Sequence, residues 1–177
     1  MSEVQYDPKE ASKMNKVLIA LRDAFKFADE SLEKKFKAIE ASELIDDLLR
    51  KNRVPFMNFI GLRDRRLPIP NISMRQAYRQ EFDGLIIIVQ DSDNLTDIIM
   101  GNERGTESIW ELYDYVFDLI ILAMTEFQDE LGFKVRFKEQ EAEAKLTTLT
   151  RQNTVKLAVE IPITIVMERF TKNIDLI

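Results

Sequence analysis

The sequence predicts an α+β domain with N-terminal helices and a mixed, mostly antiparallel sheet of about four strands, on which one long amphipathic helix packs. Three observations predict this class. From residue 155 to residue 167 every second side chain is apolar, which is the period of a half-buried strand. Residues 85–89 form a continuous apolar run, typical of a central strand covered on both faces. Residues 106–131 carry apolar side chains at spacings of three and four, typical of an amphipathic helix.

The first third of the chain is predicted to be helical. Residues 1–8 form an extension, and a helix is predicted over residues 8–38 because apolar side chains recur at helical spacing from Met14 to Leu32. Ser42 is predicted to cap a second short helix that ends in basic residues. We therefore divide the chain into an N-terminal helical segment, residues 1–53, and an α+β sheet domain, residues 54–177, which together are expected to form one compact domain.

Two strands separated by a loop are predicted next. Residues 56–62 alternate in the manner of a strand, and residues 81–90 contain the apolar run. The segment between them, RDRRLPIPNISMRQ, has two prolines and little periodicity, so it is predicted to be an exposed functional loop. A polar loop is predicted over residues 91–105, in which residues 95–100 could form a short turn of helix.

The main helix and a closing hairpin complete the predicted fold. Ser108 and Glu111 have the spacing of a capping box, and Gly132 suits the position just after a helix end. A strand is predicted from residue 133 through an acidic stretch to about residue 148. After a polar reversal at residues 151–153, the final strand is predicted to return antiparallel and to end near residue 170.

Composition excludes several classes of protein. The 177 residues include no cysteine and no histidine, which excludes disulfides, Cys/His zinc sites and catalysis through histidine or a thiolate. The 5 glycines form no nucleotide-binding loop, and we expect no cofactor. No apolar stretch approaches the ~20 residues that cross a bilayer, and the polar N-terminus lacks the apolar region of a secretory signal, so we expect no membrane association.

The net charge of −6 is unevenly distributed. Residues 50–79 contain eight basic residues and one acid, Asp64, which gives this region +7 and leaves −13 on the rest of the chain. Such asymmetry indicates a surface that meets a partner of opposite charge. The alternative is a solvated loop with scattered salt bridges.

Five arginines of this region are candidate interaction residues: Arg63, Arg65, Arg66, Arg75 and Arg79. Guanidinium groups bind phosphates and carboxylates bidentately. Modules that bind nucleic acid usually interleave basic residues with aromatic ones, and here only one tyrosine lies near in the sequence. An acidic protein surface is therefore favoured over nucleic acid as the partner.

Three glutamates, Glu139, Glu141 and Glu143, fall on one face of the predicted extended strand. They form either a solvated outer face or an acidic wall that faces a channel or a basic partner. An acidic wall suits a ring through which DNA slides, because it lacks the strong attraction of basic side chains for phosphates.

Asp91, Asp93 and Asp97 follow the central strand, and a carboxylate cluster of this kind is what a Mg²⁺ site would use. The spacing begins like a calcium-binding EF-hand loop, but Leu95 and Asn102 stand where that loop needs ligands. The alternative is that these residues only form a turn, in which Asp, Ser and Asn are common.

Taken together, the order of elements resembles that of the tail terminator, or tail completion, proteins of long-tailed bacteriophages. The shared layout comprises an opening helix, a strand pair at residues 56–62 and 82–90, an amphipathic helix of the type ESIWELYDYVFDLIILAM, and a closing hairpin that ends in VKLAVEIPITIVMERF. The resemblance covers roughly residues 10–170. The extra segment at residues 42–53 and the long Arg-rich loop depart from it.

The resemblance implies a structural virion protein that is not an enzyme. Members of this family form hexameric rings that cap the tail tube and dock it to the head–neck connector, in virions assembled in the host cytoplasm. The implied partners are further copies of the chain, the tube protein and the connector protein, and DNA passes through the lumen without specific binding. By the same resemblance, Glu139, Glu141 and Glu143 face the lumen, and the Arg-rich loop contacts a neighbouring subunit, the tube or the neck.

Two alternatives stay open. One is another neck, connector or adaptor protein that binds an acidic partner through residues 63–66. The other is a Mg²⁺-dependent phosphoryl-transfer or nuclease domain that uses Asp91 and Asp93 with Glu139 or Glu141.

Overall fold

The structure, a computed structural model, describes residues 13–50, 54–74, 76–90, 95–101, 107–126, 131–138, 144–151 and 154–170. Its elements in chain order are α1 (Lys13–Ala28), α2 (Leu32–Lys35), β1 (Ala38–Ala41), α3 (Ile45–Arg50), β2 (Phe56–Pro68), β3 (Ala77–Gln90), α4 (Leu95–Met100), α5 (Ile109–Thr125), β4 (Lys134–Phe137), β5 (Lys145–Arg151) and β6 (Thr154–Phe170). The predicted α+β class is confirmed, although the described residues form six strands rather than about four.

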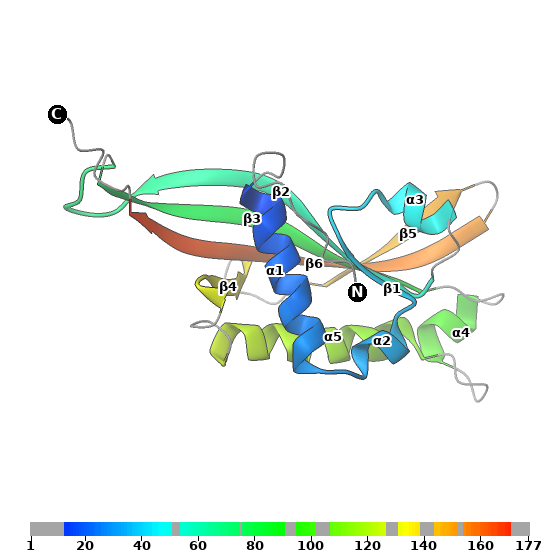
Figure 1. The fold of residues 1–177 in the computed structure, drawn as a ribbon. Coiled ribbons are helices and arrows are strands. Elements are labelled where there is room, and N and C mark those ends of the chain that lie inside the picture. Colours follow the sequence, from blue (N-terminus) through cyan, green and yellow to red (C-terminus); the bar gives the residue numbers. More distant parts are fainter. Residues whose placement is uncertain are drawn as a thin grey trace, which may run out of the picture.

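All of these strands belong to one sheet in the order β1-β2-β3-β6-β4, with β5 also paired to β6 (Figure 1). Strand β1 runs parallel to β2, and every other pair is antiparallel, so the sheet is mixed and mostly antiparallel as predicted. The central pair is β3 with β6, which stay in register from Ala77 opposite Phe170 to Gln90 opposite Leu157.

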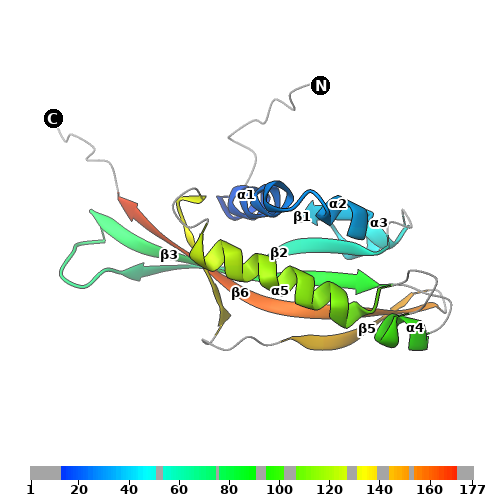
Figure 2. The same ribbon diagram turned by 90° about the horizontal axis from the view of Figure 1, so that it is seen from below.

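The two faces of the sheet are covered unequally. Helices α1, α2, α4 and α5 pack on one face, and Figure 2 shows α5 lying along it. Helix α3 packs on the other face at one end of the sheet, where Leu48 joins Phe56, Ile87 and Val89. The first face therefore holds the main core, and much of the second face has no helix over it within the described part of the chain.

The predicted period of two in the last strand is confirmed by burial. The alternate residues of β6 that face α1 and α5 are all buried: Leu157, Val159, Ile161, Ile163, Ile165 and Met167. Residues 86–89 of β3 are buried on both faces, as predicted for a central strand. These two strands carry the apolar surface on which the helices assemble.

The main helix begins as predicted. The Ser108 hydroxyl accepts a hydrogen bond from the Glu111 backbone N–H at 3.1 Å, and the Glu111 carboxylate accepts one from the Ser108 N–H at 2.7 Å. This reciprocal capping box satisfies two donors at the helix start. The predicted end of this helix is wrong, because α5 ends at Thr125, where the Glu126 N–H donates to the Leu122 carbonyl. Gly132 adopts a φ of +66°, the left-handed conformation that favours glycine, but it does not directly follow α5.

The prediction of a helix continuing to residue 38 is wrong. Helix α1 ends at Ala28, and the Asp29 carboxylate accepts a hydrogen bond from the Ser31 N–H at 2.8 Å, which forms a turn before the short helix α2. Residues 38–41 are a strand, because they pair in parallel with β2. The N-terminal segment thus contributes a strand to the sheet as well as helices to its core.

Ser42 does not cap α3, contrary to prediction. It has a φ of +62°, and its hydroxyl donates to the Asn15 side-chain oxygen at 2.9 Å. The helix begins at Ile45, after Leu44, whose carbonyl accepts from the backbone N–H groups of Asp47 and Leu48. The left-handed turn at Ser42 ends β1 and redirects the chain toward α3.

The first part of the Arg-rich segment, residues 63–68, is strand rather than the predicted loop, whereas residues 69–74 and 76 lie in the turn between β2 and β3. Strand β2 continues to Pro68 and pairs with β3 on both sides of a bulge between Gly61 and Arg63. At the bulge, a Cβ on Gly61 would lie 1.8 Å from the Met14 sulfur, so the glycine lets α1 approach the strand. Pairing with β3 thus makes residues 63–68 a strand despite their charges and proline, which would favour a loop. An edge strand tolerates such residues.

The predicted strand of residues 133–148 is two strands on one edge of β6. Phe137, the last residue of β4, pairs with Ile163, and Lys145, the first residue of β5, pairs with Glu160. The chain therefore advances eight residues between the two strands while β6 advances only three, so the pairing with β6 is interrupted between them. Pro162 lies at this interruption, where neither β4 nor β5 pairs with it. A proline has no N–H for a ladder, and it fits a central strand only at such a gap.

The contact between α1 and β2 gives a test of the core. The Phe59 and Phe25 rings meet edge to face at 5.4 Å, and both side chains are fully buried. Phe59→Ala is expected to lower the free energy of unfolding by about 3–5 kcal/mol through lost burial and a cavity. Phe27→Ala is the matched control, because Phe27 lies on α1 near Phe25 but is 86% exposed, and it is expected to change the free energy of unfolding by ~0.5 kcal/mol or less. Urea denaturation measures both, and equal losses would contradict the placement of α1.

Candidate functional site

Three strands of the sheet extend beyond the helices as a β-arm, which we define as residues 62–68 of β2, 77–83 of β3 and 164–170 of β6 (Figure 1). Phe82, Ile165 and Met167, at the base of the β-arm, still belong to the main core. Its cause is a difference in length. The 14 residues of β3 span about 46 Å, whereas the 17 residues of α5 span about 26 Å. A helix of this length cannot cover the strand from end to end, so one end of the sheet projects.

The β-arm gathers four of the five arginines that the sequence singles out. Arg63, Arg65 and Arg66 lie on β2, and Arg79 lies on β3. The fifth, Arg75, lies outside the described residues. These arginines have different environments, which decide their availability to a partner.

Arg65 is bound within the chain. Its guanidinium lies 3.2 Å from the Glu81 carboxylate and 3.0 Å from that of Asp83. Arg136 of β4 reaches Glu81 from the other side at 2.9 Å. The Thr164 hydroxyl donates to Asp83 at 3.2 Å.

This charged cluster lies on the sheet face that faces away from α1 and α5. Glu81 and Asp83 are only 6% and 8% exposed at the side chain, because the longer arginines cover them. Carboxylates this buried need paired donors. The acids and Arg136 were not selected from the sequence, although Glu81 and Asp83 are two residues apart on a predicted strand and so share a face.

The opposite face of the β-arm has its own pairs. The Gln80 amide donates to both Asp64 carboxylate oxygens at 3.0 Å, and the Arg66 guanidinium lies over the Tyr78 ring at 5.7 Å from its centre. Arg63 and Arg66 are exposed. They are the arginines of β2 that the β-arm offers to a partner.

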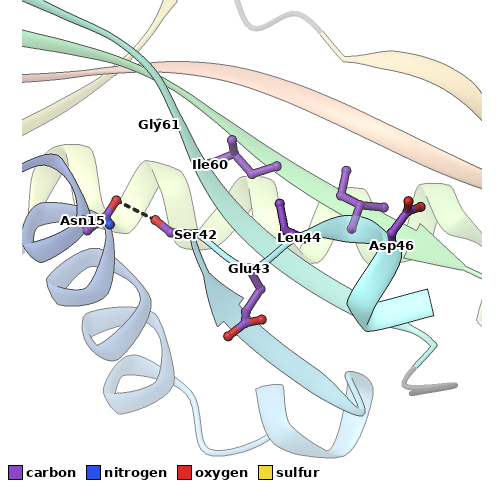
Figure 3. Close-up of a pocket in the computed structure, with 8 residues that line it drawn as sticks. Asn15, Ser42, Glu43, Leu44, Asp46, Ile60 and Gly61 are labelled. Atoms are coloured by element: carbon purple, nitrogen blue, oxygen red, sulfur yellow. Dashed lines mark hydrogen bonds between the residues drawn. The ribbon is translucent and has the colours of Figure 1, made fainter. Parts of the chain in front are cut away.

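A hollow of about 550 Å³ lies beside the base of the β-arm (Figure 3). It is lined by Asn15 of α1, the turn and first residues of α3, and β2: Ser42, Glu43, Leu44, Ile45, Asp46, Ile60 and Gly61. The hydrogen bond from Ser42 to Asn15 closes one end, and the buried Asn58 amide fixes the turn by donating to the Glu43 carbonyl at 2.8 Å. The hollow joins three segments distant in sequence, so no local pattern predicts it.

Beside the hollow, the outer edge of β2 is no longer paired with a described strand. Strand β1 pairs with β2 only at Phe56–Phe59, and its last outer bond runs from the Ser42 N–H to the Phe59 carbonyl at 2.7 Å. No described strand pairs with the outer edge of β2 from residue 60 to residue 68. Open edges of this length are surfaces for pairing with another chain unless charges protect them.

A second polar cluster joins α5 to the α1–α2 turn. No partner for Tyr115 is identifiable from the sequence, but its hydroxyl donates to the Asp29 carboxylate and lies 3.0 Å from the Ser31 hydroxyl. Lys35 pairs with Glu107 and lies 5.0 Å from the centre of the Tyr115 ring. Burial and the Asp29 hydrogen bond raise the pKa of Tyr115 to about 12, and the bonds from Tyr115 and Ser31 lower the pKa of Asp29.

Most of the other predicted site residues lie outside the part of the chain that the structure describes. Glu139, Glu141 and Glu143, with Asp91 and Asp93, lie outside the described residues. Asp97 lies in the first turn of α4. Within the part of the chain that the structure describes, no three acidic side chains are grouped so that they could hold a metal ion.

Comparison with known proteins adds no assignment. No family model matches the chain, and no curated protein matches it. Among the described residues, no helix is both long enough and apolar enough to span a membrane.

The charged cluster predicts unequal roles for neighbouring arginines. Removing one partner of a buried ion pair lowers the free energy of unfolding by about 3–5 kcal/mol. For Arg65→Ala we expect a smaller loss of about 1–3 kcal/mol, because Arg65 is 34% exposed and Arg136 remains paired with Glu81. Arg63→Ala, two residues away and exposed, is expected to stay within ~0.5 kcal/mol of the parent. Chemical denaturation measures both, and a neutral Arg65→Ala would show that the cluster does not stabilise the β-arm.

The Tyr115 cluster predicts a pH dependence. The raised pKa of Tyr115 gives stability that is complete below pH 10 and is lost as pH rises toward 12, and the lowered pKa of Asp29 gives stability that is lost as pH falls below 3.8. Tyr115→Phe is expected to lower the free energy of unfolding by about 1 kcal/mol at neutral pH. It is also expected to reduce the loss of stability with pH at both the acidic and the alkaline end of the range. Urea denaturation across this range measures it, and parallel curves for the two proteins would contradict the assignment.

Proposed function

We propose that the chain is a structural ring subunit of a phage-like tail, a tail terminator or completion protein that caps the tail tube and docks it to the head–neck connector. The observation that carries the proposal is the β-arm, a hydrogen-bonded three-stranded projection whose β2 edge is paired with no described strand. The projecting residues contribute little to the hydrophobic core of their own subunit, whereas in an assembly they could contact a neighbouring subunit.

The order of elements supports the same proposal. Helix α1, the strand pair β2–β3, the amphipathic helix α5 on the sheet and the closing hairpin β5–β6 follow the layout of that family. The extension of β2 to Pro68 turns the variable Arg-rich segment into part of the projection. The N-terminal elements pack on the sheet through the main core, so the subunit would enter an assembly as one body.

Exposed apolar side chains support a role in protein contacts. Leu62 at the base of the β-arm is 59% exposed, and Ile72 and Met74 at its tip are 39% and 45% exposed. Large apolar side chains gathered at the ends of a projection favour contact with another protein surface. In the proposed virion ring, six copies surround a lumen through which DNA passes, with Glu139, Glu141 and Glu143 as the lumen-facing acids.

A second candidate is an adaptor that binds an acidic partner as a monomer, which the exposed Arg63 and Arg66 favour. The enzyme hypothesis keeps Asp91 and Asp93 as Mg²⁺ ligands. The three functions differ in oligomeric state and in metal binding, so solution measurements separate them.

The ring function predicts assembly of the purified protein. Light scattering across a concentration series is expected to give a mass near six times the 20.7 kDa chain, and negative-stain images of the same sample are expected to show rings with a central hole. A strict monomer throughout the series would favour the adaptor or the enzyme. A Mg²⁺ titration of the parent and of an Asp91→Asn/Asp93→Asn variant would then distinguish those two.

A further inference from the structure

We propose that the tip of the β-arm of one copy docks into the hollow beside β2 of a second copy, so that the chain assembles head to tail. The tip is the turn between β2 and β3, described at residues 69–74 and 76, and the hollow is the one bounded by α1, the turn at Ser42, α3 and β2. The inference rests on the proposed ring function and names the surfaces that would close the ring.

The hollow has the chemistry of a receptor for an apolar side chain with a basic flank. Ile45 and Ile60 contribute its apolar lining, and Leu44, which also lines it, is 69% exposed. Its lining contains two acids, Glu43 and Asp46, and no basic residue. In Figure 3 the Glu43 and Asp46 carboxylates lie on either side of Leu44.

The tip has the matching chemistry. Ile72 and Met74 are both exposed there, and residues 66–79 contain three arginines and no acid. Backbone hydrogen bonds shape the turn, from the Ile72 N–H to the Ile69 carbonyl at 3.1 Å and from the Gln76 N–H to the Ser73 carbonyl at 2.8 Å. A preformed turn loses little conformational entropy on binding, and opposite charges orient it toward the acids of the hollow.

The two surfaces cannot meet within one chain. Gly61 lines the hollow and Pro68 lies at the tip end of the same strand, seven residues or about 23 Å farther along. Strand β2 is paired with β3 over this whole stretch, so it cannot bend the tip back. Figure 1 shows the tip at the end of the β-arm, away from α1 and α3.

Each copy therefore carries one tip and one hollow. A contact between unlike surfaces repeats from copy to copy, and it produces a closed ring when the rotation between neighbours divides a full turn. The outer face of α5 is a competing acidic surface, with Glu111, Asp114 and Asp118 exposed. The hollow is the better receptor, because it is concave and combines an apolar lining with the acids.

Two variants test the contact. The tip variant is Ile72→Ser/Met74→Ser, and the hollow variant is Glu43→Lys/Leu44→Ser; all four side chains are exposed. Serine also suits position 44, which precedes α3. The matched controls are Met100→Ser, 73% exposed on α4, and Asp114→Lys on α5. Circular dichroism and thermal unfolding establish that each variant folds like the parent.

Sedimentation velocity and light scattering then measure assembly. Each variant alone is expected to associate at least tenfold more weakly than the parent and to run as a monomer, while both controls assemble as the parent does. An equal mixture of the two variants is expected to form a one-to-one pair of twice 20.7 kDa, because the hollow variant keeps an intact tip and the tip variant keeps an intact hollow.

The outcomes separate the two proposals. If the parent forms rings and both variants do so as well, or if the mixture forms no pair, the docking contact is wrong and the ring function stands. If the Asp114→Lys control loses assembly and the hollow variant keeps it, the receptor is α5 instead. If the parent stays monomeric at every concentration, the ring function and the docking contact both fail.

Discussion

The antiparallel pairing of β3 with β6 is the constraint on which the rest of the structure depends. These strands stay in register over all 14 residues of β3. Strands β2, β4 and β5 pair on their outer edges, and β1 pairs in turn with β2. Their alternate apolar side chains create the surface that α1 and α5 cover. Because the strand pair is longer than either helix, one end of the sheet must project. The β-arm is thus a geometric consequence of the same pairing that forms the core.

The uncovered sheet face shows how this projection remains stable. A face without a helix would expose the polar residues of β3 to water, but Arg65 and Arg136 extend over Glu81 and Asp83 and bury them. Part of the positive charge that the sequence concentrates near residue 65 is therefore neutralised inside the molecule. The charge available to a partner is smaller and lies nearer the edge and the tip of the β-arm.

Strand β2 connects the two ends of the proposed assembly contact. At its base it is held by β1 and α1 and borders the hollow, and at its far end it presents the tip. The bulge at Gly61 separates these regions and changes the side-chain alternation between them. A single strand thereby fixes the distance between a binding surface and its receptor, which is what a repeating contact between identical subunits requires.

The sequence by itself determined the α+β class, the alternation in β6, the buried run in β3 and the capping box of α5. Each of these depends on residues close together in the chain, so their periods and spacings can be recognised without a structure. Only the tertiary structure decided that 38–41 is a strand, that β2 continues through the arginines, and that the segment after Gly132 forms two strands divided at Pro162. It also decided that Arg65 is bound internally and that a hollow lies beside β2. These features depend on strand pairing, desolvation and packing between segments far apart in sequence, and local sequence patterns do not predict which distant segments come together.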